Sequence, residues 1–462
     1  MALPRASFSD LGWILAAFGA IGLASLAPLG AADRTAYVVA ELNAKNAALT
    51  SALRTEKYTL MEAGFFAFYR GSNHLYWKDY GTSSQLSTYG NVAATRIWLQ
   101  GDMHASNFGS FTNDQNKVVY DANDFDEAVL GDYQLDVWRA AVSLVLIMRD
   151  NGGFSATDEN NVVDSFTEWY LDTVEARRGN SSETTATYTK SNTYGQLDDL
   201  LISAEGKTRK QMLDKWTSKN GSGIRYLNPA INSDLAAVSG AVASAITAQI
   251  ASYGATLSGG ISYSASKFAV KSVAQRLHAG VGSLGTTRYY VLIEGPTTGQ
   301  DDDVILDVKA QSAPSAYLNL SASSVTATNT AAGSNHAKRV VTAAKALGNY
   351  VDDYLGWMTV SGQAYSVKER SPTKDDIDTT TLTTFDKVTK MAEQWGAILA
   401  TAHCRADLDA NATNVPYDFD QQVYNRINGN HDAFRSKVRS IAIPYADQVE
   451  YDFWSFYVNL AP

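Results

Sequence analysis

Residues 96–139, RIWLQGDMHASNFGSFTNDQNKVVYDANDFDEAVLGDYQLDVWR, combine two strand-like apolar runs with a dense group of carboxylates. Only Arg96, Lys117 and Arg139 oppose the acidic side chains. Such an excess of like charge destabilises a folded segment unless a cation neutralises it. Carboxylate and amide oxygens bind hard divalent cations, so the stretch predicts strands that deliver such ligands to one place. Its acidic residues are Asp102, Asp114, Asp121, Asp124, Asp126, Glu127, Asp132 and Asp136.

Composition narrows the class of protein. The chain has 462 residues, of which 45% are hydrophobic and 19% charged, so it is a globular protein with room for two or three domains. The formal net charge of −10 argues against a nonspecific nucleic-acid binder, and we expect no nucleic-acid partner. The single cysteine, Cys404, excludes a disulfide framework and a cysteine-rich zinc site.

The N-terminus has the pattern of an export signal. Arg5 precedes an uncharged, apolar run at residues 11–32 that ends in small residues. We predict a signal peptide or membrane anchor at residues 1–32, and hence a secreted or membrane-anchored protein. An anchor with the remaining chain on the cytoplasmic side, and a buried N-terminal helix, are the alternatives.

Apolar periodicity and turn residues predict the main elements of secondary structure. A capping box, Ser155 to Asp158, predicts the start of a further helix. Segments rich in Ser and Thr predict surface loops at 177–197 and 321–335. Helices are predicted at residues 36–56, 135–148, 234–253, 336–355, 382–403 and within 417–457. Strands are predicted at residues 289–293, 304–308 and 364–369.

A second informative stretch spans residues 276–310, RLHAGVGSLGTTRYYVLIEGPTTGQDDDVILDVKA. A glycine-rich turn precedes a predicted hairpin whose second strand delivers Lys309. Glycines allow backbone N–H groups to approach phosphates closely, and a lysine on a strand can neutralise phosphate charge. Protein kinases hold nucleotide phosphates in this way. The nucleotide contacts predicted here are Gly280, Gly282, Ser283, Gly285 and Lys309.

Several segments, in matching order, are similar to the signature of a large and mainly bacterial family, domain of unknown function 2252. The two longest are GDMHASNFG at 101–109 and VVYDANDFDEAVLGDYQLDVWRAAVSL at 118–144. The family is grouped with protein-kinase-like folds, so the resemblance implies an α+β, two-lobed kinase-like architecture. The other segments are FYRG at 68–71, GVGSLGTTRYYVLIEG at 280–295, VKA at 308–310, LGWMTVSGQAYSVKE at 355–369 and AILATAHCRA at 397–406.

The acidic motifs also resemble the catalytic and metal loops of aminoglycoside and choline kinases. That resemblance implies that Asp102 orients or deprotonates an acceptor hydroxyl, with His104 supporting the same catalytic loop. Asn107 and Asp124 would hold Mg²⁺ beside ATP, and Asp126 is a rival to Asp124 as the metal ligand. Phosphoryl transfer needs these residue types, because metal and lysine meet the phosphate charge while a carboxylate positions the nucleophile.

Two further residues receive supporting roles. Asp136 would brace the catalytic loop from the helix that follows it. Arg70 is a candidate anion contact, and an ion pair between Arg70 and a carboxylate is an equally weighted alternative.

The order of these motifs differs from that of ordinary kinases, in which the glycine-rich loop and lysine come first. Here they follow the catalytic loop, so we predict a circularly permuted fold. Residues 33–265 would form a large, mainly helical lobe with the catalytic and metal loops. Residues 266–372 would form a small β-rich nucleotide lobe, and the helices of 373–462 would return to the large lobe.

The sequence favours an ATP- and Mg²⁺-dependent phosphotransferase that acts on an unidentified hydroxyl acceptor. Kinases pair the strand lysine with a glutamate, but no glutamate lies between Pro296 and Lys368. Either Asp307, Asp352 or Asp353 pairs with Lys309, or Lys309 has no partner. A nucleotide-binding pseudokinase with a regulatory or scaffolding role is therefore one alternative, and an exported metal-dependent hydrolase is another.

Overall fold

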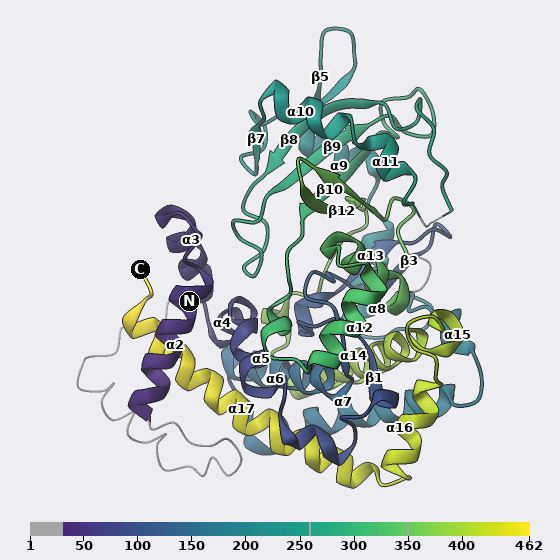
Figure 1. The fold of residues 1–462 in the computed structure, drawn as a ribbon. Helices are drawn as coiled ribbons and strands as arrows, with labels where there is room; N and C mark the ends of the chain where they lie inside the picture. The colour runs from purple at the N-terminus through teal and green to yellow at the C-terminus, as the bar shows by residue number, and fades with distance from the viewer. Residues whose placement is uncertain (1–30, 258–259, 349–350) are drawn as a thin grey trace.

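The computed structural model describes residues 31–257, 260–348 and 351–462, and the ribbon divides into two parts (Figure 1). The upper part is built on a six-stranded sheet, and the lower part is a body of long helices. The predicted α+β class is therefore confirmed. The predicted signal or anchor lies, up to residue 30, outside the described residues.

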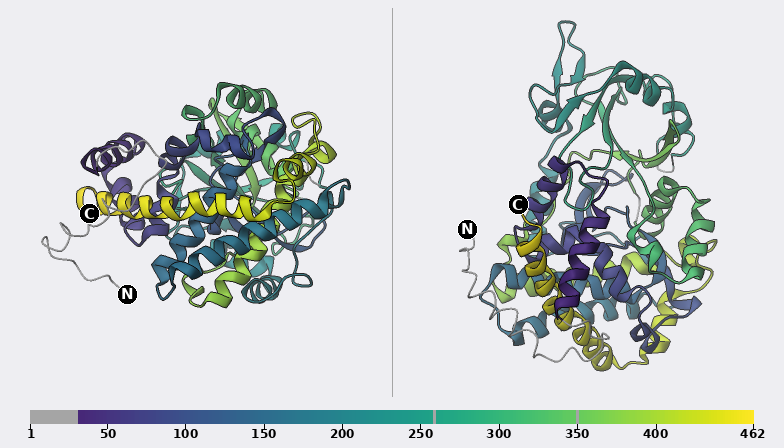
Figure 2. Two further views of the ribbon diagram at one scale, coloured as in Figure 1. Left: turned by 90° about the horizontal axis from the view of Figure 1, so that it is seen from below. Right: turned by 60° about the vertical axis from the view of Figure 1, so that its left-hand side comes forward.

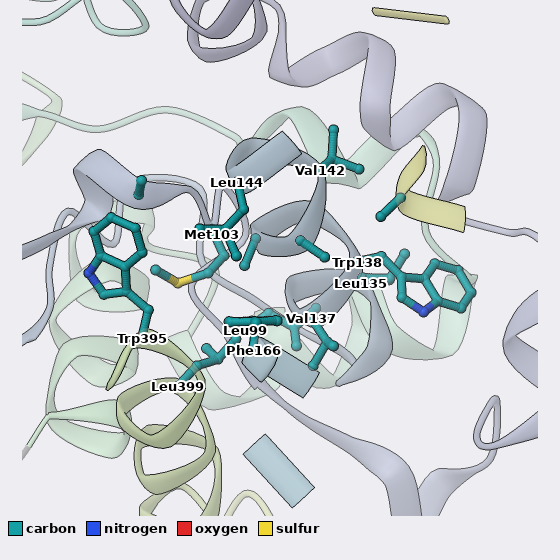
Figure 3. Close-up of a cluster of buried hydrophobic side chains, with 14 of the residues drawn as sticks. Leu99, Met103, Leu135, Val137, Trp138, Val142, Leu144, Phe166, Trp395 and Leu399 are labelled. Atoms are coloured by element: carbon teal, nitrogen blue, oxygen red, sulfur yellow. The ribbon is translucent and has the colours of Figure 1, made fainter. Parts of the chain in front are cut away.

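Four long helices form the centre of the helical body. Helix α6 is largely apolar, and every side chain from Gln134 to Met148 is buried. Figure 3 shows side chains of α6 packed against Phe166 and Leu399, which belong to two neighbouring helices. α7 begins at the predicted capping box, because the Ser155 hydroxyl accepts from the Asp158 N–H and the Asp158 carboxylate accepts from the Ser155 N–H. The four helices are α6 (Gln134–Asn151), α7 (Ala156–Arg177), α14 (Phe385–Arg405) and α17 (His431–Asn459).

The packing of α14 on α7 depends on a glycine. A Cβ atom at Gly396 would lie 2.2 Å from the Phe166 carbonyl oxygen, which belongs to the backbone of α7. We expect Gly396→Ala to force the two helices apart and to lower the free energy of unfolding by about 1–3 kcal/mol. Urea denaturation measures this loss, and Gly221→Ala is the control because a Cβ atom there meets nothing within 4 Å. Equal stability of the two variants would contradict the assigned contact.

Both ends of the described chain belong to the helical body. Helix α2 (Ala31–Lys45) lies beside α17 in both views of Figure 2. Arg34 of α2 links the two ends of the described chain, since its guanidinium donates at 2.9 Å to Asp452 of α17 and also to Asp79. The remaining helices of this body are α3 (Ser51–Met61), α4 (Phe65–Gly71), α5 (Asn73–Tyr80), α8 (Gln196–Glu205), α12 (Ala322–Ala332), α13 (His336–Leu347), α15 (Leu408–Asn411) and α16 (Phe419–Ile427).

The large sheet is antiparallel throughout, in the order β11-β12-β10-β9-β8-β7. All three predicted strands are present, as β9, β10 and β12. In the central strand β10, Lys309 lies opposite Arg288 of β9 and Ser366 of β12. The strands are β7 (Leu235–Ala237), β8 (Val270–Arg276), β9 (Arg288–Ile293), β10 (Val304–Ala310), β11 (Gly356–Val360) and β12 (Gln363–Glu369).

The part built on this sheet begins before residue 266, where the sequence predicted a boundary. Trp216, at the end of α9 (Arg209–Trp216), packs edge-on against Tyr290 with ring centroids 5.0 Å apart. The predicted helix at 234–253 is wrong at its start, because β7 joins the sheet edge and only then do α10 (Gly240–Thr247) and α11 (Ile250–Gly254) follow. A short hairpin, β5 (Thr217–Lys219) and β6 (Arg225–Leu227), extends beside them.

Two further predictions of secondary structure are corrected. The predicted helix at 36–56 is two helices, since α2 ends at Lys45 and Thr50 caps the start of α3. The predicted loop at 321–335 contains α12. Its buried Ser324, Thr328 and Ala332 recur every fourth residue, so a sequence of low complexity still has one packed face.

Two small two-stranded ladders hold the acidic stretch. β1 (Arg96–Leu99) pairs with β4 (Val129–Asp132), and β2 (Phe108–Thr112) pairs with β3 (Val118–Ala122). The loops after β1 and β3 therefore emerge together.

Among the described helices, none combines the length and apolar character that a membrane crossing requires.

Candidate functional site

A cavity of about 280 Å³ lies where the sheet meets the helical body. The body contributes the loops after β1 and β3 and part of α4, and the sheet contributes the glycine-rich loop between β8 and β9. Segments that are far apart in the sequence therefore meet in one cleft. The predicted site residues that line it are Arg70, Asp102, His104, Asn107, Asp124, Asp126, Gly280, Gly282 and Ser283.

Asp136 braces the loop that carries Asp102. From the first turn of α6, its carboxylate accepts hydrogen bonds from the N–H of Gln100 at 2.6 Å and of Gly101 at 3.1 Å. Gly101 has φ +85° and passes so close to Glu127 that a Cβ atom would lie 2.1 Å from the Glu127 carbonyl oxygen. Only glycine fits that turn, and the turn directs Asp102 into the cleft.

Arg139, one turn after Asp136 on α6, holds the Asp102 carboxylate. Its Nε donates to Asp102 Oδ1 at 2.8 Å, and its guanidinium carbon lies 4.0 Å from the centroid of the Tyr69 ring. Sequence reasoning counted Arg139 only as an opposing charge and missed this role. The spacing of three residues on a helix, which places Asp136 and Arg139 on one face, was the available signal.

The ionisation of Asp102 provides a test of this geometry. Burial raises the pKa of Asp102 to about 7, against the opposing effect of Arg139. A folded-state pKa above the unfolded value of 3.8 contributes stability below about pH 4 that is lost as pH rises towards 7. We expect the stability of the wild type relative to Asp102→Asn to fall across this window. Urea unfolding at a series of pH values measures it, and a constant difference would contradict the raised pKa.

His104 lies against Asp102 without forming a charged pair. Its Nε2 is 3.7 Å from Asp102 Oδ2, and burial, together with Arg70 and Arg139, lowers the pKa of His104 well below its usual value. The imidazole is therefore neutral at pH 7. Its ring packs edge-on against Phe66, which fixes the wall of the cleft next to Asp102.

The two candidate metal ligands are joined through the backbone. Asn107 donates its side-chain N–H to the Asp102 carbonyl at 2.9 Å, which leaves its side-chain oxygen for another partner. The Asn123 N–H donates to the Asn107 carbonyl at 2.8 Å, so the loop of Asp124 is fixed to that of Asn107. Asp124 has φ +56°. This left-handed backbone conformation is uncommon outside glycine, but aspartate and asparagine adopt it more readily than other residues. Amide and carboxylate oxygens of this kind suit Mg²⁺.

Lys309 faces these carboxylates from the sheet. Its Nζ lies 3.6 Å from Asp124 Oδ1 and forms a closer ion pair with Asp126. Gln311 donates to Asp126 Oδ1 at 2.7 Å and so fixes the other oxygen of that carboxylate. Burial would raise the pKa of Asp124, but Lys309 and three further cations lower it below the usual range. Asp124 is therefore a permanent anion beside Lys309.

The expected substitutes for the missing glutamate do not pair with Lys309. Asp307 pairs with Arg288, whose Nε donates to it at 2.6 Å. Asp352 accepts from the Tyr354 N–H at 2.9 Å, and Asp353 accepts from the Gly260 N–H at 2.8 Å. The partners of Lys309 among the described residues are instead the two carboxylates of the cleft.

The glycine-rich loop closes the cleft from above. Gly280 and Gly285 have φ +77° and +86°, and the Ser283 hydroxyl donates to the Ala279 carbonyl at 2.9 Å, which shapes the turn. Gly285 and Lys309 line an adjoining cavity of about 110 Å³ rather than the larger one. Gly285 also allows contact with the helical body, since a Cβ atom there would lie 2.4 Å from a methyl group of Leu49.

Three cations line the cleft from helices of the body: Lys45 at the end of α2, Lys57 of α3 and Arg70 of α4. The Arg70 side chain makes no ion pair or hydrogen bond within the described part of the chain, so the predicted carboxylate partner is not found there. Lys57 of α3 is only 4% exposed and donates to Asn46 at 2.8 Å; burial lowers the pKa of Lys57 to about 8. Sequence reasoning missed Lys57, because the helix that carries it has no motif that would mark a binding site.

Searches of curated proteins and of solved structures give no significant match to this chain. A family model matches residues 50–459, a span that contains every residue of the predicted site. Because that match covers most of the sequence, the chain belongs to the family described as uncharacterised proteins conserved in bacteria, DUF2252.

Proposed function

We propose that the protein is an ATP- and Mg²⁺-dependent phosphotransferase of circularly permuted kinase-like fold, acting on a hydroxyl acceptor. The observation that carries the proposal is the position of Lys309. Its Nζ approaches Asp124 to 3.6 Å from the sheet, and Asp102 and Asn107 line the same cavity as Asp124. Kinases use the same kinds of residue for phosphoryl transfer: a lysine on a strand of the sheet, and aspartate and asparagine side chains from the helical lobe.

The order of the chain supports the permutation. In ordinary kinases the glycine-rich loop precedes the catalytic loop; here the strands that flank it, β8 and β9, follow both acidic loops. The helices after residue 372 pack again on the helical body, and α2 lies against α17. A permuted connection requires that the two ends lie near each other, as the first and last helices of the described chain do.

Each side chain has a definite task in this scheme. Arg139 holds Oδ1 of Asp102, so Oδ2 is the atom that orients the acceptor hydroxyl and receives its proton. Asn107 and Asp124 would hold Mg²⁺, which supplies positive charge to the transferred phosphoryl group. Lys309, Arg70 and the N–H groups of the glycine-rich loop bind the nucleotide phosphates.

A second candidate, a nucleotide-binding pseudokinase, rests on the two ion pairs of the cleft. Arg139 engages the Asp102 carboxylate, and Asp126 engages the ammonium group of Lys309. A carboxylate that is already paired with a guanidinium is a weaker base. If both pairs persist when nucleotide binds, the cleft would hold ATP without transferring its phosphoryl group.

Two measurements separate these candidates. We expect ATP with Mg²⁺ to raise the melting temperature more than either component alone, and Asp124→Asn to remove the additional rise. Absence of any shift with nucleotide and metal would overturn both candidates. Transfer of radiolabelled γ-phosphate to cell extract or to small hydroxyl compounds, lost in Asp102→Asn, supports the phosphotransferase, whereas binding without transfer supports the pseudokinase.

A further inference from the structure

Five carboxylates gather at the end of α14, apart from the cleft and unused by the proposed function. Three separate segments supply them: the short 3-10 helix Ser182–Thr184, the turn after α14, and the start of α16. Figure 1 places α16 low on the helical body and α15 at its right-hand edge, both away from the sheet. The carboxylates are those of Glu183, Asp407, Asp409, Asp418 and Asp420, and none of them lines the cleft cavity.

Their spacing suits a cation. One oxygen each from Glu183, Asp407 and Asp409 lies within 4.8 Å of the others, and the same holds for Asp407, Asp418 and Asp420. Oxygens bound to Ca²⁺ at about 2.3–2.6 Å are at most about 5 Å apart across the ion. Both sets fall within that limit. Asp407 belongs to both sets and is the centre of the cluster.

Buried oxygens in the cluster have no partner, and this is the independent sign of a missing ligand. Glu183 is 1% exposed, yet neither of its carboxylate oxygens accepts a hydrogen bond. Asp420 is 3% exposed, and its Oδ1 also has none. Native proteins leave few buried polar atoms unsatisfied, and an unpaired buried charge is costly. Coordination of an ion is one of the ordinary reasons for such an atom.

Arg405, the cation at the end of α14, is committed elsewhere. The Nε of Arg405 donates to the Glu183 carbonyl at 3.1 Å, and its Nη1 donates to Asp121 at 2.6 Å. Within residues 31–257, 260–348 and 351–462, no lysine, arginine or histidine forms an ion pair with any of the five carboxylates. Arg405 thus fixes the backbone that carries Glu183 without neutralising the side chain.

Backbone contacts hold the other carboxylates in place. Asp407 Oδ2 accepts from the Phe419 N–H at 2.9 Å, and Asp418 caps α16 by accepting from the Gln421 N–H at 2.9 Å. The cluster is therefore a preformed arrangement on three anchored segments. Protons are the rival means of neutralising it, because burial and neighbouring carboxylates raise the pKa of Asp420 to about 9.

We propose that this cluster is a structural Ca²⁺ site centred on Asp407. All of its ligand atoms are oxygens, which select a hard cation over zinc or copper. Ca²⁺ accepts six to eight oxygens in flexible geometry, whereas Mg²⁺ requires near-octahedral geometry and keeps much of its water. A cluster of five carboxylates from three segments fits Ca²⁺ better. The bound ion fastens the turn after α14 to the segment around Glu183.

The test uses the full chain after treatment with EDTA and dialysis. We expect saturable binding of ⁴⁵Ca²⁺ in equilibrium dialysis, and a higher melting temperature with Ca²⁺ than with equimolar Mg²⁺. Glu183→Gln is the first variant, since the Glu183 side chain accepts no hydrogen bond that glutamine would lose. It should fold in EDTA and bind Ca²⁺ roughly tenfold or more weakly, a loss of the size seen on removing support from a metal site. Asp420→Asn should behave in the same way.

Two controls locate the ion. Asp386→Asn removes an exposed carboxylate on α14 that pairs with Lys390, and it should leave Ca²⁺ binding unchanged. Asp124→Asn in the cleft should also leave it unchanged while it weakens the effect of ATP with Mg²⁺, so the two proposals fail separately. No saturable Ca²⁺ binding by the wild type, undiminished binding in both cluster variants, or loss of binding in Asp124→Asn would each overturn the Ca²⁺ site.

Discussion

Replacing Lys309 with methionine is expected to weaken ATP binding by roughly 10- to 100-fold and to remove phosphoryl transfer. Lys309 is 7% exposed in the middle strand of the sheet and is the cation closest to Asp124 and Asp126. A charge-assisted hydrogen bond contributes about 1.5–3 kcal/mol, which corresponds to that range of affinity. Titration with a fluorescent ATP analogue in the presence of Mg²⁺ measures the loss, which follows from the proposed function.

The control is a lysine on the adjacent strand. Lys368 of β12 is exposed and lines neither cavity, so Lys368→Met removes the same charge from the same sheet without removing a phosphate contact. We expect its affinity for the analogue to stay close to that of the wild type. If both variants bind equally well, Lys309 does not contact the nucleotide; if both lose binding equally, the effect is one of net charge.

Local patterns predicted the strands beside this cleft, and the resemblance to aminoglycoside and choline kinases predicted its acidic residues. Short runs rich in β-branched and aromatic residues predicted β9, β10 and β12, because such residues favour strands that are buried between neighbouring strands. Asp102, Asn107 and Asp124 follow short strands, and hydrogen bonds between neighbouring loops bring them to one place. The role of Asp136 was predicted from the resemblance to aminoglycoside and choline kinases, and its carboxylate accepts from the N–H groups of Gln100 and Gly101. Each of these signals lies within one continuous stretch of sequence.

Contacts between distant segments could not be predicted in the same way. The low-complexity sequence around Thr328 did not predict α12. A contact with a distant segment holds this helix, since the Thr328 hydroxyl accepts from the Leu130 N–H at 2.9 Å. Trp216 joins the sheet through a tertiary contact with Tyr290, so the part built on the sheet begins before the boundary predicted at residue 266. Glu183 and Asp407 meet only because α14 returns to the helical body. Long-range packing decides such positions, and local propensity does not.

Replacing Arg139 with methionine should lower the free energy of unfolding by about 3–5 kcal/mol, because removing one partner of a buried pair leaves the other charge without compensation. Arg139 is 1% exposed and donates from Nε to Asp102 at 2.8 Å. The contact between the guanidinium and the Tyr69 ring is lost as well. Urea denaturation at about pH 8, where the Asp102 carboxyl is ionised, gives the measurement.

A double variant distinguishes loss of charge pairing from loss of packing. In Arg139→Met with Asp102→Asn, the buried carboxylate is gone, and we expect the double variant to be more stable than Arg139→Met alone. The recovery should be larger at about pH 8 than at about pH 5, because at low pH the single variant neutralises Asp102 by protonation. Replacing both partners of a buried ion pair is often nearly neutral, so most of the loss should return. If the double variant is as unstable as the single one, packing on Tyr69, and not the ion pair, is what Arg139 contributes.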